Sequence, residues 1–151
     1  MSKDYERYHG IVIRSLVTHL PEGVHIQCKD IHGIANCFQI NQNTGLLIKH
    51  SSSRRSPWVF SFTGDNLAEL ELLSGESPKA TFVALVCGWD GFLILSEAEL
   101  KDLADRKNVE SSLSIHVKRG KHKMYSVGGR KKLKRQKQKG FSQDFFQCLE
   151  N

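Results

Sequence analysis

The densest cluster of reactive side chains in this sequence is a run of basic residues near its C-terminus. Residues 128–140, GGRKKLKRQKQKG, carry seven positive charges in thirteen residues and contain no acidic residue. Charges of one sign at this density repel one another, so the segment favours an anionic partner that neutralises them. A phosphate backbone is the commonest such anion, and binding to it releases condensed counterions. We therefore expect this run to contact nucleic acid.

The candidate nucleic-acid contacts extend beyond this run. All eleven basic residues after position 117 lie between Lys118 and Lys139, with no acidic residue among them. The loop SSSRRSP at 51–57 adds hydroxyl and guanidinium groups, which suit phosphate oxygens. No helix offers a set of side chains for reading a groove, so we expect binding without sequence specificity. The candidate contacts are Lys118, Arg119, Lys121, Lys123, Arg130, Lys131, Lys132, Lys134, Arg135, Lys137, Lys139, Arg54 and Arg55.

The distribution of charge supports an anionic partner without identifying it. The chain has 151 residues and a net charge of +6. Residues 1–117 contain 11 basic and 14 acidic residues, whereas residues 118–151 contain 11 basic and 2 acidic residues. Such asymmetry bears on partners rather than on fold. An acidic protein, an anionic membrane surface, a nuclear import receptor and bulk solvent are the other readings of the basic run.

The remaining reactive side chains do not form a recognisable metal or nucleophile motif. Four cysteines are present, none of them in a CxxC pair, and the N-terminus does not resemble a secretion signal. We therefore expect free thiols, a cytoplasmic location and no cofactor. There is also no GxSxG, P-loop or GxGxxG motif. A zinc site would have to use four residues whose spacing differs from that of closed zinc sites: His25, Cys28, His32 and Cys37.

These side chains are positioned by a predicted α+β fold. The run 80–87 is continuously apolar, which is typical of a central strand, and Asp90-Gly91 predicts a hairpin turn after it. Asp65 is the predicted cap of the second helix, and Ser96 with Glu99 has the spacing of a capping box for the third. The predicted helices cover 4–20, 66–74 and 96–104. The predicted strands cover 24–29, 34–40, 46–50, 58–62, 80–87, 92–95, 112–118 and 123–127.

The order of these elements predicts how the chain is organised. Helices between strands require at least one crossover, so we expect a single domain with a mixed β-sheet flanked by helices. This core domain covers residues 1–127, followed by a basic loop at 128–140. Residues 141–151 carry aromatic residues at helical spacing, and we expect this C-terminal segment to dock on the core. No apolar run is long enough for a transmembrane helix.

A helix, a three-strand meander, a second helix and a buried strand over residues 4–95 resemble the core of the restriction-endonuclease-like fold. In that family the PD-(D/E)xK signature places acids and a lysine on the meander. The acids hold Mg²⁺ and the lysine positions the attacking water. Lys49 matches that lysine, and Asp30 and Glu6 are the nearby acids. However, Leu47 stands two residues before Lys49, where the family has a carboxylate.

The resemblance and the charge pattern together imply a non-catalytic or degenerate nuclease-like domain. In this hypothesis the domain binds nucleic acid through the basic C-terminal segment, without sequence specificity. One alternative is a small interaction module whose partner is an acidic protein. The other is an active metal-dependent nuclease that uses Asp30 and Lys49 with an acid placed elsewhere.

Overall fold

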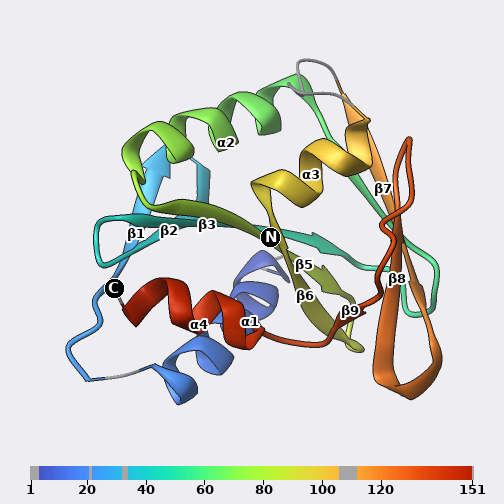
Figure 1. Ribbon diagram of the computed structural model, residues 1–151, viewed down its shortest axis with the longest axis horizontal. Helices are drawn as coiled ribbons and strands as arrows, with labels where there is room; N and C mark the ends of the chain where they lie inside the picture. Colours follow the sequence, from blue (N-terminus) through green and yellow to red (C-terminus); the bar gives the residue numbers. More distant parts are fainter. Residues whose placement is uncertain (1–3, 21, 32–33, 106–111, 151) are drawn as a thin grey trace.

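The computed structural model describes residues 4–20, 22–31, 34–105 and 112–150 (Figure 1). The helices are α1 (Asp4–His19), α2 (Gly64–Glu76), α3 (Glu97–Ala104) and α4 (Gln143–Glu150). The strands are β1 (Ile26–Ile31), β2 (Ile34–Ile40), β3 (Thr44–Ser51), β4 (Trp58–Phe62), β5 (Ala80–Cys87), β6 (Gly91–Ser96), β7 (Leu113–Arg119), β8 (Met124–Gly128) and β9 (Lys137–Gln138). A 3₁₀ turn at Lys121–Lys123 connects β7 to β8.

The first sheet is mixed and has the strand order β1-β2-β3-β5-β6. The first three strands form an antiparallel meander, β3 pairs with β5 in parallel, and β5 and β6 form an antiparallel hairpin. Helix α2 lies in the crossover between the two parallel strands. These features confirm the predicted α+β fold, the interior position of the 80–87 strand and the hairpin at Asp90-Gly91.

Helices cover both faces of this sheet. Figure 1 shows α2 and α3 on one side of it and α1 and α4 on the other. Along β3, Leu47 joins the core beneath α2 and α3, while Leu46 and Ile48 join the core beneath α1 and α4. Because both faces are covered, β5 needs apolar side chains at nearly every position, which explains its continuous apolar sequence.

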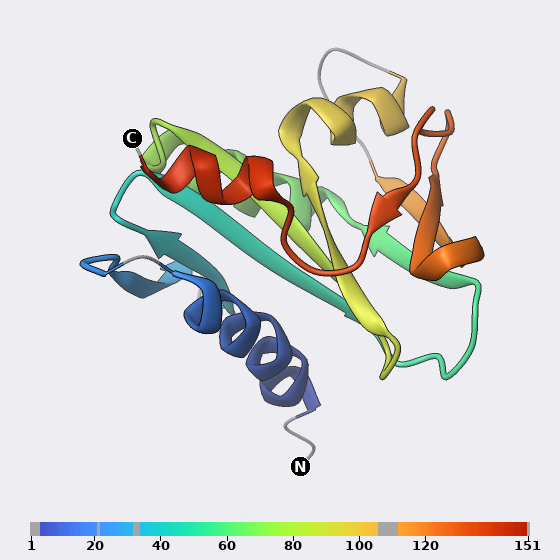
Figure 2. The same cartoon turned by 60° about the horizontal axis from the view of Figure 1, so that its bottom comes forward.

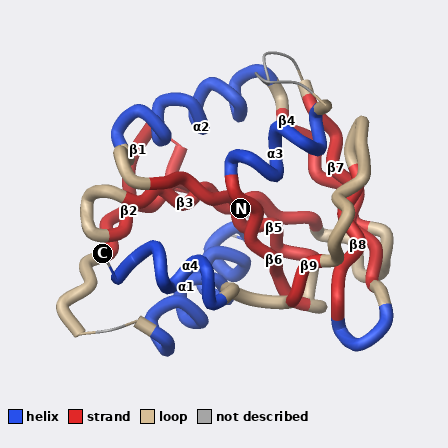
Figure 3. Tube along the Cα trace, in the orientation of Figure 1, coloured by secondary structure: helices blue, strands red, loops and turns tan. Residues whose placement is uncertain are grey.

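A second sheet, which the sequence analysis did not anticipate, has the strand order β4-β7-β8-β9 and is antiparallel (Figure 3). Trp58, Phe60 and Phe62 of β4 point inward and are buried, as their alternation predicts. Their partners on β7, Ile115 and Val117, are also buried. The second sheet therefore shares the core beneath α2 and α3 with the first sheet.

The two internal helices begin with capping boxes. Ser96 caps α3 as predicted: its hydroxyl accepts from the Glu99 amide at 3.2 Å, and the Glu99 carboxylate accepts from the Ser96 amide at 3.0 Å. The predicted cap of α2 is wrong, because Thr63, not Asp65, holds that position. The cap must immediately precede the first helical residue in extended backbone conformation, and α2 begins at Gly64. Asp65 instead lies in the first turn, where its charge favours the helix dipole.

The segment that carries the basic run is held against the domain on both sides. The Leu133 amide donates to the Val127 carbonyl at 3.0 Å, and the Gly140 amide donates to the Phe92 carbonyl at 2.7 Å. Beyond it, α4 buries Phe145, which packs edge-on against Phe82 with ring centroids 4.9 Å apart. The basic residues at 130–135 therefore sit in a loop with fixed ends, as Figure 2 shows beside β8.

Two further expectations concern the redox state of the cysteines and the presence of a transmembrane helix. Cys28, Cys37, Cys87 and Cys148 are all free thiols. Within the described part of the chain, none of the helices is long and apolar enough to cross a membrane.

Candidate nucleic-acid interface

Lys49 lies at the end of β3, facing the core beneath α2. Its ammonium group donates to the Ser61 carbonyl at 2.9 Å and to Asn66 Oδ1 at 3.0 Å, and it lies 5.2 Å from the centroid of the Phe62 ring. Burial lowers the pKa of Lys49, and the charge of Glu69 opposes this by raising it. Lys49 therefore ties β3 to β4 and to the start of α2.

Glu69 of α2, which the sequence pattern did not single out, is the acid whose charge raises the pKa of Lys49. Its side chain is 1% exposed, and neither carboxylate oxygen is accessible to solvent. Burial raises the pKa of the Cys37 thiol to about 12, with a further contribution from Glu69. Glu69 follows Asn66 by three residues, so helical spacing places both on one face of α2; that is the signal that could have found it.

Of the two acids proposed from the sequence, Glu6 does not lie beside Lys49. Glu6 is exposed on α1, and α1 covers the opposite face of the sheet. The neighbour of Lys49, His50, stacks on Tyr8 of α1 with ring centroids 4.4 Å apart, which confirms that Lys49 itself faces away from α1. The side chain of Asp30 lies outside the described residues.

No zinc or other metal cluster forms within the described ranges. No group of three or more His, Cys, Asp or Glu side chains lies together there. Of the four residues of the zinc reading, Cys28 pairs with Phe38 across β1 and β2, so Cys28 and Cys37 point to opposite faces of the sheet. His32 lies outside the described residues.

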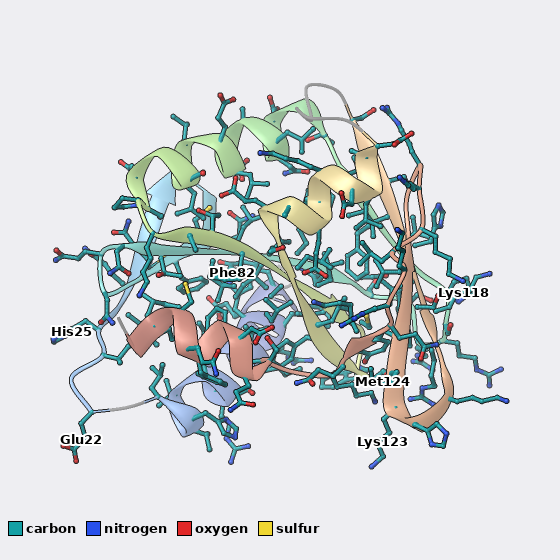
Figure 4. The ribbon with its side chains drawn as sticks, viewed as in Figure 1. Glu22, His25, Phe82, Lys118, Lys123 and Met124 are labelled. Atoms are coloured by element: carbon teal, nitrogen blue, oxygen red, sulfur yellow. The ribbon has the colours of Figure 1, made fainter. Side chains whose placement is uncertain are left out.

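Most of the candidate phosphate contacts are exposed on the second sheet and on the loops beside it. We call this set the cationic flank; Figure 4 shows two of its members, Lys118 and Lys123, pointing away from the protein. The flank combines the end of β7, the turn that follows it, the loop after β8 and the loop after β3. Its residues, all exposed, are Arg54, Arg55, Lys118, Arg119, Lys121, Lys123, Arg130, Lys131, Lys132, Lys134 and Arg135.

The loop at 51–57 is brought to the flank by hydrogen bonds to its backbone and hydroxyl groups. The Arg119 amide donates to Ser56 Oγ at 2.9 Å, so the loop meets the end of β7. The buried Trp58 indole donates to the Ser53 carbonyl at 2.9 Å and holds the other part of the loop. Arg54 and Arg55 lie between these two anchors, beside the basic end of β7.

Lys137 and Lys139 are less available than the sequence suggests. The Lys137 ammonium group pairs with the Glu99 carboxylate at 2.9 Å, and that of Lys139 pairs with the Asp90 carboxylate at 3.0 Å. Both lysines are partly buried, and we leave them out of the cationic flank. Arg119 also pairs with Asp90, but its side chain remains 58% exposed. These acids come from other elements, so a count along the basic run could not reveal them.

The outer face of the second sheet is uncovered and lacks acidic side chains among its described residues. Across β4, β7 and β8, the side chains on this face are apolar, hydroxyl, imidazole or basic groups. They are Val59, Ser61, Ser114, His116, Lys118, Met124 and Ser126. A polyanion lying along the cationic flank would therefore meet no carboxylate on this part of the sheet.

One exposed aromatic residue next to the flank was also missed. Trp89, in the turn between β5 and β6, is 71% exposed, more than any other large hydrophobic residue that the structure describes. Its position between Gly88 and Asp90-Gly91 in a predicted hairpin turn was the available signal.

In comparisons with known proteins, no protein-family model, no curated protein and no solved structure matches this chain.

Proposed function

We propose that this protein binds nucleic acid through its phosphate backbone, without sequence specificity and without cleaving it. The observation that carries the proposal is the cationic flank, a set of eleven exposed basic side chains on the second sheet and on the loops beside it. Exposed basic side chains that gather in this way provide the electrostatic footprint of a nucleic-acid-binding protein. Two acids pair with members of the flank: Asp105, whose carboxylate lies 4.0 Å from the Lys131 ammonium group, and Asp90, which pairs with Arg119. A cytoplasmic location belongs to this proposal.

The absence of catalysis in this proposal rests on the surroundings of Lys49. Leu47, at the position of the family's carboxylate, is fully buried and has no oxygen to bind a metal. Glu69 does have a carboxylate, but its oxygens are closed to solvent. Mg²⁺ in proteins usually keeps several bound waters, so a site for it needs solvent access. Lys49 then has a structural role, because its hydrogen bonds connect β3 to β4 and to α2.

The restriction-endonuclease-like resemblance is part of the same proposal. Its support is the meander β1-β2-β3 followed by a crossover through α2 to a parallel β5, with helices on both faces of the sheet. This is the element order on which the resemblance was based. A degenerate nuclease-like domain would retain affinity for the phosphate backbone after losing its metal-binding acid.

Fluorescence anisotropy of a labelled duplex at several salt concentrations tests this function. We expect log K to fall linearly with log salt, with a slope of about −0.9 for each phosphate neutralised. Heparin should compete strongly, and polyglutamate, which offers carboxylates in place of phosphates, should compete weakly. Binding of polyglutamate as tight as that of DNA would instead support the acidic-protein reading. Failure to bind any duplex or single strand at low salt would refute the proposed function.

A further inference from the structure

Trp89 lies in a turn, where a tryptophan side chain does not contribute to the stability of the fold. Turns between strands favour small and polar residues, which satisfy the backbone locally. A tryptophan side chain stabilises a protein mainly by burying its large apolar surface, and Trp89 is 71% exposed. The indole of Trp89 is thus available to a partner.

On the N-terminal side of Trp89, the backbone is held by the loop after β3. The Gly88 amide donates to the Ser51 carbonyl at 2.9 Å. Gly88 has φ +53°, and a Cβ at this residue would lie 2.5 Å from the Ser53 carbonyl oxygen. Only glycine fits this close approach of two backbones. The turn and the loop that carries Arg54 and Arg55 are therefore packed against each other, as Figure 2 shows at the end of the first sheet.

On the C-terminal side of Trp89, Asp90 holds the turn in place. The Asp90 carboxylate is 5% exposed and accepts from the Tyr125 hydroxyl at 2.7 Å and from the Lys139 ammonium group at 3.0 Å. It also pairs with Arg119. The one acid next to Trp89 is therefore already neutralised, and the network fixes the turn to the second sheet.

Trp89 thus projects from a rigid turn with basic side chains on both sides of it. Arg54 and Arg55 lie in the loop bound to Gly88, and Arg119 and Lys139 are bound to Asp90. An exposed aromatic ring among cations that can contact phosphates is the combination by which proteins bind single strands. In a duplex each base already stacks on its neighbours, whereas an unpaired base has a free face for an indole.

We infer that Trp89 is a stacking platform for an unpaired base, and that the preferred ligand of this protein is single-stranded nucleic acid. This inference rests on the proposed function and narrows its substrate class. The phosphates on either side of the stacked base contact Arg54, Arg55 and Arg119. DNA and RNA share the required base and phosphate chemistry, so both are used as probes.

Tryptophan fluorescence can test this directly, because the chain contains only two tryptophans. Trp58 is 1% exposed and out of reach of a ligand. We expect oligothymidylate or oligouridylate to quench the emission of Trp89, and an abasic strand with the same number of phosphates to bind without this quenching. Trp89→Ala should weaken single-strand binding about tenfold, which is about 1.4 kcal/mol. Its affinity for duplex should be unchanged.

Leu72→Ala is the matched control, because Leu72 is also exposed, at 47%, but lies on α2 away from the flank. This variant should bind single strands as tightly as the parent. Equal quenching by the abasic strand, or unchanged single-strand affinity in Trp89→Ala, would overturn the inference. If duplex binding then persists with its salt dependence, the proposed function survives. Quenching of Trp89 by polyglutamate alone would overturn both and favour an acidic protein partner.

Discussion

The loop after β8 provides the sharpest test of the cationic flank. Replacing its five basic residues with glutamine removes five positive charges and keeps polar, unbranched side chains. All five side chains are exposed, and the loop is anchored through backbone groups, such as the Lys131 amide on the Leu103 carbonyl at 3.1 Å. The fold should therefore survive the substitution. The variant combines Arg130→Gln, Lys131→Gln, Lys132→Gln, Lys134→Gln and Arg135→Gln.

The expected effect is a shallower salt dependence. Each phosphate contact contributes about 0.9 to the slope of log K against log salt on duplex DNA, so five contacts contribute about 4.5. Between about 50 mM and 200 mM salt, the parent would then lose about 500-fold more affinity than the variant. Because these contacts involve phosphates rather than bases, binding should weaken equally for all sequences. Arg54→Ala with Arg55→Ala should produce a smaller loss of the same kind.

Anisotropy titrations of parent and variant over this salt range measure both quantities. The control is Arg7→Gln with Arg14→Gln, which removes exposed charges from α1 on the far side of the first sheet. That control should leave the slope unchanged. Thermal melting should show that each variant unfolds within a few degrees of the parent. A five-residue variant that binds DNA as tightly as the parent, with the same slope, would refute the role of this loop.

Three other outcomes are expected. The protein should not cleave DNA or RNA with Mg²⁺ or Mn²⁺; reproducible cleavage that disappears in Lys49→Ala or Glu69→Gln would contradict this. All four cysteines should react with a thiol reagent after denaturation without reductant. In the native protein, Cys37 and Cys87 should react slowly, because burial raises the pKa of each thiol to about 12. Burial lowers the pKa of His9, so below about pH 6.5 the unfolded chain takes up a proton that the folded protein resists. The free energy of unfolding should therefore be largest above that pH and fall as the solution is acidified; a His9→Gln variant that retains the same pH dependence in chemical denaturation would disprove the assignment.

Much of the fold follows from short-range patterns in the sequence. The capping box of Ser96 and Glu99, the hairpin turn at Asp90-Gly91 and the buried face of β4 were all predicted. Each depends on residues within a few positions of one another, through a local hydrogen bond, a turn preference or the two-residue alternation of a strand. The cap of α2 was assigned to Asp65, whereas Thr63, two residues earlier, holds it, because Thr63 is the residue in extended conformation directly before Gly64.

The division of the strands into two sheets was decided by tertiary structure. Trp58 pairs with Val117 across two strands that are far apart in the chain. Alternation predicts that each strand has a buried face, but not which distant strand it will join. The second sheet, which positions the cationic flank, therefore could not be predicted from local pattern.

The same distinction applies to the candidate site. The sequence alone shows a polybasic segment, because charge density is a property of composition. Only the folded chain shows that Lys137 and Lys139 are paired with Glu99 and Asp90, acids that lie far from them in sequence. Likewise, only the folded chain shows that the Trp89 side chain is 71% exposed. Exposure and ion pairing depend on which distant segments meet, and those meetings are determined by the packing of the whole domain rather than by neighbours along the chain.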